Sequence, residues 1–322
     1  MKVSEIKELL KGYTEKEKDR IIIELYNKIP KGMRRDKDID YYLQNAHLNK
    51  EKEKIAYTYD ADFLSELNYF LECAKEGLYA SPNRIISKSE RTSWNTKAKK
   101  FYKVLVNTDP TTDDGMDATD YLITLFNLLS YGTHCLVFSS WKTFSRINTH
   151  QMDYLSMLYK RILINGSTDD ALRKCAKLSL IYADADALTR FGIMMLSSVV
   201  QEKDDKLKLI EILKKEIADF KKRNQRDSYY VCEYYYGMLY MYFTIQEFAE
   251  GIKYYLQSSS DTVESNVCRV LNALEDLEYY DEWVEFYEKY EKKLGDRDSL
   301  KEKYTNYKAG NYDFDKEKYI FL

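Results

Sequence analysis

Proline and glycine are scarce along this chain. Its 322 residues include 3 Pro and 11 Gly, whereas average usage predicts about 16 Pro and about 23 Gly. Folds built from many short strands need these residues at their turns, so their scarcity argues against a turn-rich all-β fold and a collagen-like chain. Because 44% of the residues are hydrophobic, the chain is also too apolar to remain disordered.

Apolar residues recur with helical spacing along nearly the whole length. Thr14 followed by Glu17 fits a capping box at a helix start, and Asp60 fits the N-cap of a later helix. Further helices are expected near residues 134–147 and 150–164. The stripe of the first capped helix follows the i, i+3, i+4, i+7 rule through Ile22, Leu25, Tyr26 and Ile29.

Residues 227–243 form a tyrosine-rich run that leaves almost no polar face. No period of two is visible there, and a strand would find no partner elsewhere in the chain. The run therefore predicts a helix that is flanked on most sides. The fold class predicted for the whole chain is all-α, with helical hairpins stacked as an irregular α-solenoid or a layered helical bundle, since a single hairpin cannot bury both of its faces.

The lysine- and glutamate-rich run at residues 49–54 is the best candidate for a domain boundary. We expect an N-terminal helical segment at residues 1–54 and a helical-repeat region at residues 55–322. The formal net charge is -3, so no global field favours a polyanion, and nucleic acid is an unlikely partner. A transcriptional regulator with a divergent helix-turn-helix around residues 30–37 remains an alternative, although Asp36, Asp38 and Asp40 lie where phosphates would approach.

No apolar run reaches the roughly 20 residues that span a bilayer, so no membrane partner is expected. The five cysteines are odd in number, widely spaced and free of CxxC pairs, which predicts reduced thiols and a cytoplasmic location.

No sequence motif indicates a metal, a cofactor or a catalytic group. The three histidines lack the second histidine or cysteine pair of a zinc site, and there is no glycine-rich phosphate loop. We therefore assign no catalytic residue, metal or cofactor. An enzyme whose site is assembled from distant residues remains an alternative, which a pocket joining His134, Cys135, or the Asp184 and Asp186 pair to other polar groups would support.

One pattern occurs twice in the C-terminal third. Residues 248–255 align with residues 280–287, and Gly237 with Tyr240 precedes the first copy. This pattern resembles the helices of a tetratricopeptide repeat, whose period is about 34 residues, over residues 229–293. The opening segment, residues 6–30, is similar to uncharacterised bacterial proteins, and that similarity implies no activity.

The repeat resemblance implies a partner-binding inner face. It assigns to that face Tyr234, Met238 and Tyr242 of one helix and Asn272, Glu275 and Asp276 of another. A two-residue misfit before Gly251 could rotate the first of these helices and expose Tyr235 or Tyr236 instead. We therefore expect non-catalytic binding of a protein or peptide, with a hydrophobic anchor and basic residues in the partner.

Overall fold

The fold of the described chain is all-α, as the sequence predicts. The computed structural model describes residues 3–30, 33–34, 39–44, 58–80, 85–134, 137–181, 189–223, 228–295 and 297–312. Helices, turns and loops account for these residues, and no strand occurs among them. None of the described helices is both long enough and apolar enough to cross a bilayer.

The chain divides into two compact units. The N-terminal unit, Met1–Tyr57, contains α1 (Val3–Lys11), α2 (Glu15–Lys28) and α4 (Ile39–Gln44). The boundary run at residues 49–54 lies outside the described residues. The C-terminal unit, Thr58–Leu322, contains α5 (Ala61–Lys75), α6 (Lys88–Thr92), α7 (Trp94–Asn107), α8 (Asp113–His134), α9 (Thr143–Arg146), α10 (Gln151–Ile162), α11 (Asp169–Ser179), α12 (Thr189–Val199), α13 (Lys203–Arg223), α14 (Ser228–Phe243), α15 (Phe248–Ser258), α16 (Val263–Asp276), α17 (Tyr280–Tyr290), the 3-10 turn η3 (Glu291–Lys293) and α18 (Asp298–Lys308).

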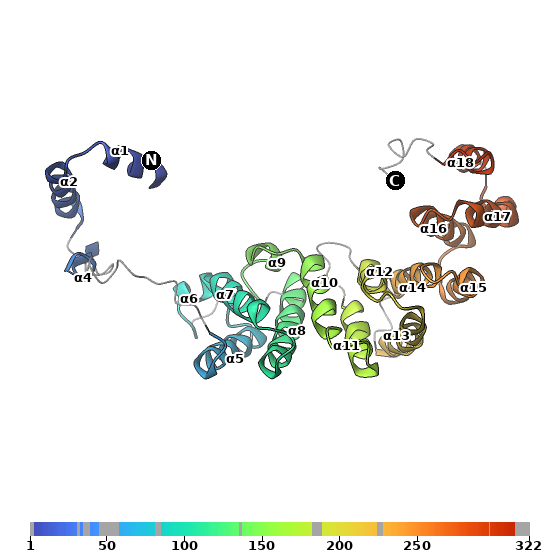
Figure 1. Ribbon diagram of the computed structural model, residues 1–322, viewed down its shortest axis with the longest axis horizontal. Coiled ribbons are helices and arrows are strands. Elements are labelled where there is room, and N and C mark those ends of the chain that lie inside the picture. The colour runs from blue at the N-terminus through green and yellow to red at the C-terminus, as the bar shows by residue number, and fades with distance from the viewer. Residues whose placement is uncertain are drawn as a thin grey trace. The chain divides into compact units, whose positions relative to one another are not determined.

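Alternate helices of the C-terminal unit pack into one continuous layer. Helix α8 contacts α10, α10 contacts α12, α12 contacts α14, and α14 contacts α16, and Figure 1 shows α8 and α10 side by side. Helices α11 and α13 pack together beside this layer, and α10–α11, α14–α15 and α16–α17 are hairpins of neighbouring helices in contact. This is the stacked arrangement expected when each hairpin must cover the apolar face of the next.

Helix α14 is enclosed as its sequence predicts. It contacts α12, α13, α15 and α16. From Val231 to Phe243 every side-chain position except Tyr240 is buried. A helix with apolar residues on all sides can be accommodated only in such a central position.

Sequence signals for helix starts are confirmed at two caps. The Thr14 hydroxyl accepts a hydrogen bond from the Glu17 amide, and the Glu17 carboxylate accepts one of 2.7 Å from the Thr14 amide. Asp60 accepts a bond of 2.9 Å from the Phe63 amide. The helix expected at residues 134–147 is wrong, because α8 runs on to His134 and only the single turn of α9 follows.

Candidate functional site

The three α14 residues assigned to a partner-binding face lie in the core. Tyr234 and Met238 have no exposed surface, and Tyr242 is 3% exposed. The Tyr234 hydroxyl donates a hydrogen bond of 2.5 Å to the carbonyl oxygen of Leu180. In this conformation the three side chains stabilise the packing of α14 and present no surface to a partner, which corrects the inner face drawn from the repeat resemblance.

Tyr240 is the tyrosine of α14 that reaches the surface between residues 231 and 243. Its side chain is half-buried, whereas the alternative candidates Tyr235 and Tyr236 are buried. Two guanidinium groups approach the ring of Tyr236, with the Cζ atoms of Arg190 and Arg269 each 5.5 Å from its centroid. Such cation–π contacts fix the two arginines beside α14.

The three predicted residues of α16 lie at or near the surface, but they differ in their partners. Asn272 and Asp276 are exposed. Glu275 is half-buried and accepts bonds of 2.6 and 2.8 Å from the Lys303 ammonium and one of 3.0 Å from the Tyr307 hydroxyl. The charge of Glu275 is therefore used to hold α18 against α16.

A buried carboxylate connects α12, α14 and α16. Glu233 on α14 is 5% exposed and accepts a hydrogen bond of 2.7 Å from Arg269 on α16. Arg190 on α12 approaches its other oxygen at 3.5 Å. Because a buried carboxylate needs compensating charge and hydrogen bonds, Glu233 positions both arginines at the same surface.

Asp276 lies beside these groups without a hydrogen bond or ion pair to any residue that the structure describes. Desolvation raises the pKa of its carboxyl, the negative charge of Glu275 raises it further, and Arg190 and Lys303 lower it. Burial also raises the pKa of the Tyr240 hydroxyl, to which the charge of Asp276 contributes. The charge of the Asp276 carboxylate thus acts on Tyr240 and Arg190, although the residue as a whole is exposed.

These residues define a mixed polar and aromatic surface, which we call the α12–α14–α16 face: Arg190, Tyr240, Arg269, Asn272 and Asp276. The carboxylate of Asp276 can accept charge-assisted hydrogen bonds from a basic side chain. The half-buried ring of Tyr240 provides an apolar surface next to it, and the Asn272 amide can both donate to and accept from a polypeptide backbone. No local sequence pattern indicates Arg190 or Arg269, because they contact Glu233 from positions far apart in the chain.

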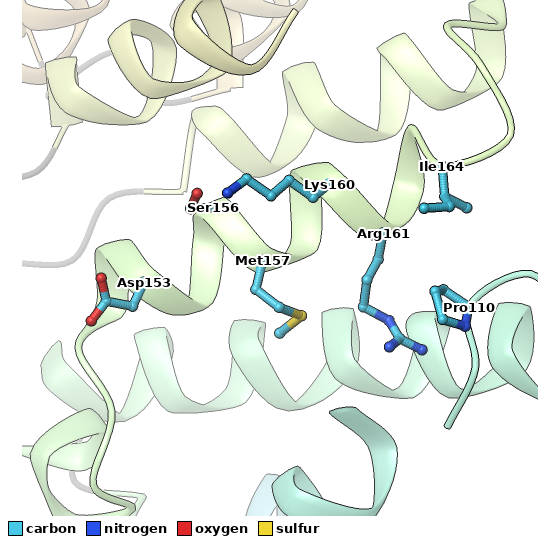
Figure 2. Close-up of a pocket in the computed structure, with 7 residues that line it drawn as sticks. All are labelled: Pro110, Asp153, Ser156, Met157, Lys160, Arg161 and Ile164. Atoms are coloured by element: carbon cyan, nitrogen blue, oxygen red, sulfur yellow. The ribbon is translucent and has the colours of Figure 1, made fainter. Parts of the chain in front are cut away.

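A pocket of about 380 Å³ lies along α10, away from this face (Figure 2). Met157 and Arg161 extend from α10 toward α8, with Pro110 beside Arg161. Its remaining lining residues are Asp153, Ser156, Lys160 and Ile164. Of the residues that the sequence suggested for an assembled catalytic site, His134 is the one that the structure describes, and it does not line this pocket.

Arg161 in this pocket is a structural residue. It is 8% exposed and donates hydrogen bonds of 3.0 to 3.3 Å to the Thr119 hydroxyl and to the carbonyl oxygens of Val106, Thr108 and Gly115. Burial lowers the pKa of its guanidinium. Its donors are committed to the turn between α7 and α8, so Arg161 joins α10 to that turn.

Most of the other sequence-derived candidates lie outside the part of the chain that the structure describes. Cys135, Asp184 and Asp186 lie outside the described residues, as does most of the predicted turn at residues 30–37. His134 is half-buried at the end of α8. Among the residues that the structure describes, no three His, Cys, Asp or Glu side chains are grouped in a way that could hold a metal ion.

Comparison with known proteins adds no family. No protein-family model, curated protein or solved structure matches the chain.

Proposed function

We propose that this chain is a non-catalytic helical-repeat protein, similar to tetratricopeptide proteins, which binds a protein or peptide segment at the α12–α14–α16 face. The proposal rests on the environment of Asp276. This residue is exposed, its carboxylate has no ion-pair partner among the described residues, and it lies beside Tyr240 and Asn272. Aromatic residues next to a charged group are typical of the energetic centres of protein interfaces.

The chemistry of this face favours a partner with an arginine or lysine. A guanidinium group paired with Asp276 could lie against the Tyr240 ring, combining a charge-assisted hydrogen bond with a cation–π contact. Arg190 and Arg269 are both paired with Glu233, so Asp276 is the one acidic group among the described residues of this face that is left for a basic partner. We therefore narrow the expected partner to a segment with a single basic residue and an apolar neighbour.

A cytoplasmic location is part of the same proposal. The described cysteines Cys73, Cys175, Cys232 and Cys268 form no disulfide, and burial raises the pKa of the Cys175 thiol to about 12. Buried protonated thiols are chemically inert and compatible with a reducing compartment.

Binding of fluorescein-labelled 12-residue peptides tests this function by fluorescence anisotropy. Each peptide carries one leucine anchor and one arginine, and the spacing between the two residues varies across the panel. A matched series has glutamate in place of the arginine. We expect micromolar binding of at least one arginine peptide, and a loss of about tenfold in D276N, equivalent to about 1.4 kcal/mol.

The control is E285Q, because Glu285 is exposed on α17 and the substitution removes the same charge away from the face. Its affinity should equal that of the wild type. Equal binding of arginine and glutamate peptides, or undiminished binding by a folded D276N variant, would contradict the proposal.

A further inference from the structure

The N-terminal unit exposes large apolar side chains to an unusual degree. None of its described side chains is buried. Its exposed apolar residues are concentrated on the first two helices and just beyond them: Ile6, Leu9, Tyr13, Ile22, Ile23, Leu25, Met33 and Leu43. The longer C-terminal unit, by contrast, contains every buried residue of the hydrophobic core.

Two exposed apolar residues of α2, Ile22 and Leu25, lie on one side of the helix, whereas Ile23, which is 60% exposed, lies off that side. Ile22 and Leu25 are 50% and 57% exposed, and Tyr26 and Ile29 continue the same side at half-buried positions. An isolated helix shorter than about 12–15 residues is marginal in water, and helices gain most of their stability by packing an apolar face. With 14 residues, α2 is close to this limit and needs a covering surface.

We propose that the apolar stripe of α2, extended by that of α1, is the contact surface of a reversible homodimer. The two copies would present the same surface to each other, as in an interface with two-fold symmetry. This inference is independent of the proposed function, since it concerns a different unit of the chain.

The charges around the stripe favour a second copy over other occupants. Residues 1–30 contain 7 basic and 6 acidic side chains. Local ion pairs at 2.7 to 3.1 Å neutralise many of them, including Lys11–Glu8, Lys18–Glu15 and Arg20–Glu24. A strongly charged partner would gain nothing from such a rim, whereas two neutral rims approach each other without repulsion.

A membrane surface fits less well. Amphipathic helices that lie in the bilayer interface carry basic residues on the polar face and Trp, Phe or Leu on the other. The polar face of α2 mixes both signs of charge, and residues 1–57 contain neither Trp nor Phe.

The area of the apolar surface on α1 and α2 indicates how strongly two copies should associate. At about 1.5 Å per residue, α2 and α1 are about 21 and about 14 Å long, and a stripe about 10 Å wide gives roughly 350 Å² per copy. Stable interfaces bury about 800 Å² per partner, so this contact belongs to the weak class. The dimer should therefore form at tens of micromolar and dissociate on dilution.

Sedimentation equilibrium of the full chain between about 1 and about 200 µM tests the dimer. The weight-average mass should rise from the 38.3 kDa of one chain toward twice that value. The variant I22D/L25D should stay at the monomer mass throughout this range and keep the wild-type melting temperature, because the substitutions lie outside the core.

The matched control is K16Q/R20Q, which changes the charge of α2 by the same amount on the opposite side and should dimerise like the wild type. A wild-type chain that remains monomeric at 200 µM would overturn the proposal. A dimer that persists in I22D/L25D would also overturn it, because another surface would then hold the copies together. A lower melting temperature in a monomeric I22D/L25D variant would assign the stripe to the chain's own fold instead.

Discussion

Two buried charged residues near α14 differ in how they are compensated. Glu233 is matched by two arginines, as described above. Lys206 is only 6% exposed, and its ammonium donates a hydrogen bond of 3.2 Å to the Thr244 hydroxyl, which itself donates to the Met241 carbonyl oxygen. No carboxylate pairs with Lys206 among the described residues. Desolvation lowers the pKa of its ammonium, so burial disfavours the charged form of Lys206 compared with its form in water.

Replacing Lys206 by methionine should therefore stabilise the protein at neutral pH. A lysine pKa that is lower in the folded than in the unfolded state costs stability below the folded pKa, and this cost disappears as the pH rises toward the unfolded value of about 10.4. The melting temperature of K206M should exceed that of the wild type by a few degrees at pH 7, and the difference should shrink toward pH 10.

Thermal unfolding followed by circular dichroism at several pH values measures this difference. K208M is the control, because Lys208 is exposed and pairs only with Asp205 at the surface. Its melting temperature should stay near that of the wild type. A K206M variant that is less stable at pH 7, or a difference that grows with pH, would show that the buried ammonium is adequately compensated.

At the scale of single helices, the sequence predicted which segments are helical and where they begin better than which side of each helix is exposed. The caps at Thr14 and Asp60 could be predicted because each joins residues only three positions apart in the chain. The orientation of α14 was not predictable, because a helix that is apolar on all sides has no polar face to indicate its rotation. Helix α16 has polar and apolar sides, and Asn272 and Asp276 of the predicted partner-binding face lie on its exposed side. The pairing of Glu275 with Lys303 depends on how α18 packs, which no local pattern reveals.

Close helix packing at two glycines supplies a test at this scale. A Cβ at Gly237 would lie 2.9 Å from the Ile193 Cβ and 3.0 Å from the Arg190 carbonyl oxygen, and a Cβ at Gly251 would lie 2.6 Å from the Tyr242 Cβ. Overpacking typically costs about 1–3 kcal/mol, whereas replacing a helical glycine by alanine gains up to about 1 kcal/mol in helix propensity. The crowding should win at both positions.

We expect G237A and G251A each to lower the melting temperature, with the larger loss in G251A because its contact is shorter. Thermal unfolding of the two variants beside Q257A, an exposed position on α15, measures the effect. An unchanged or raised melting temperature in G251A would mean that α14 and α15 separate easily to admit a methyl group.

At the scale of the whole molecule, most helix contacts join elements that are one or two steps apart along the chain. Helix α14 packs against four helices, whereas α18 packs mainly against α17. In such arrays stability is approximately the sum of each unit and its neighbouring interfaces. Residues near the centre should then open least often, and terminal helices most often.

Native-state hydrogen exchange should reveal this gradient directly. Amides of α14 should exchange most slowly, those of α18 faster, and those of α1 and α2 fastest in dilute protein, since no described side chain of the N-terminal unit is buried. Raising the concentration should slow exchange in α1 and α2, and in no helix of the C-terminal unit, if their apolar surface is covered by a second copy. One experiment therefore separates packing within the chain from packing between chains. In G237A, protection should fall in α12 and α14 together, because the substituted glycine lies between them, while α5 and α7 keep their wild-type rates. Loss of protection to the same extent along the entire C-terminal unit would instead indicate a single cooperative core, in which distant hairpins unfold only together.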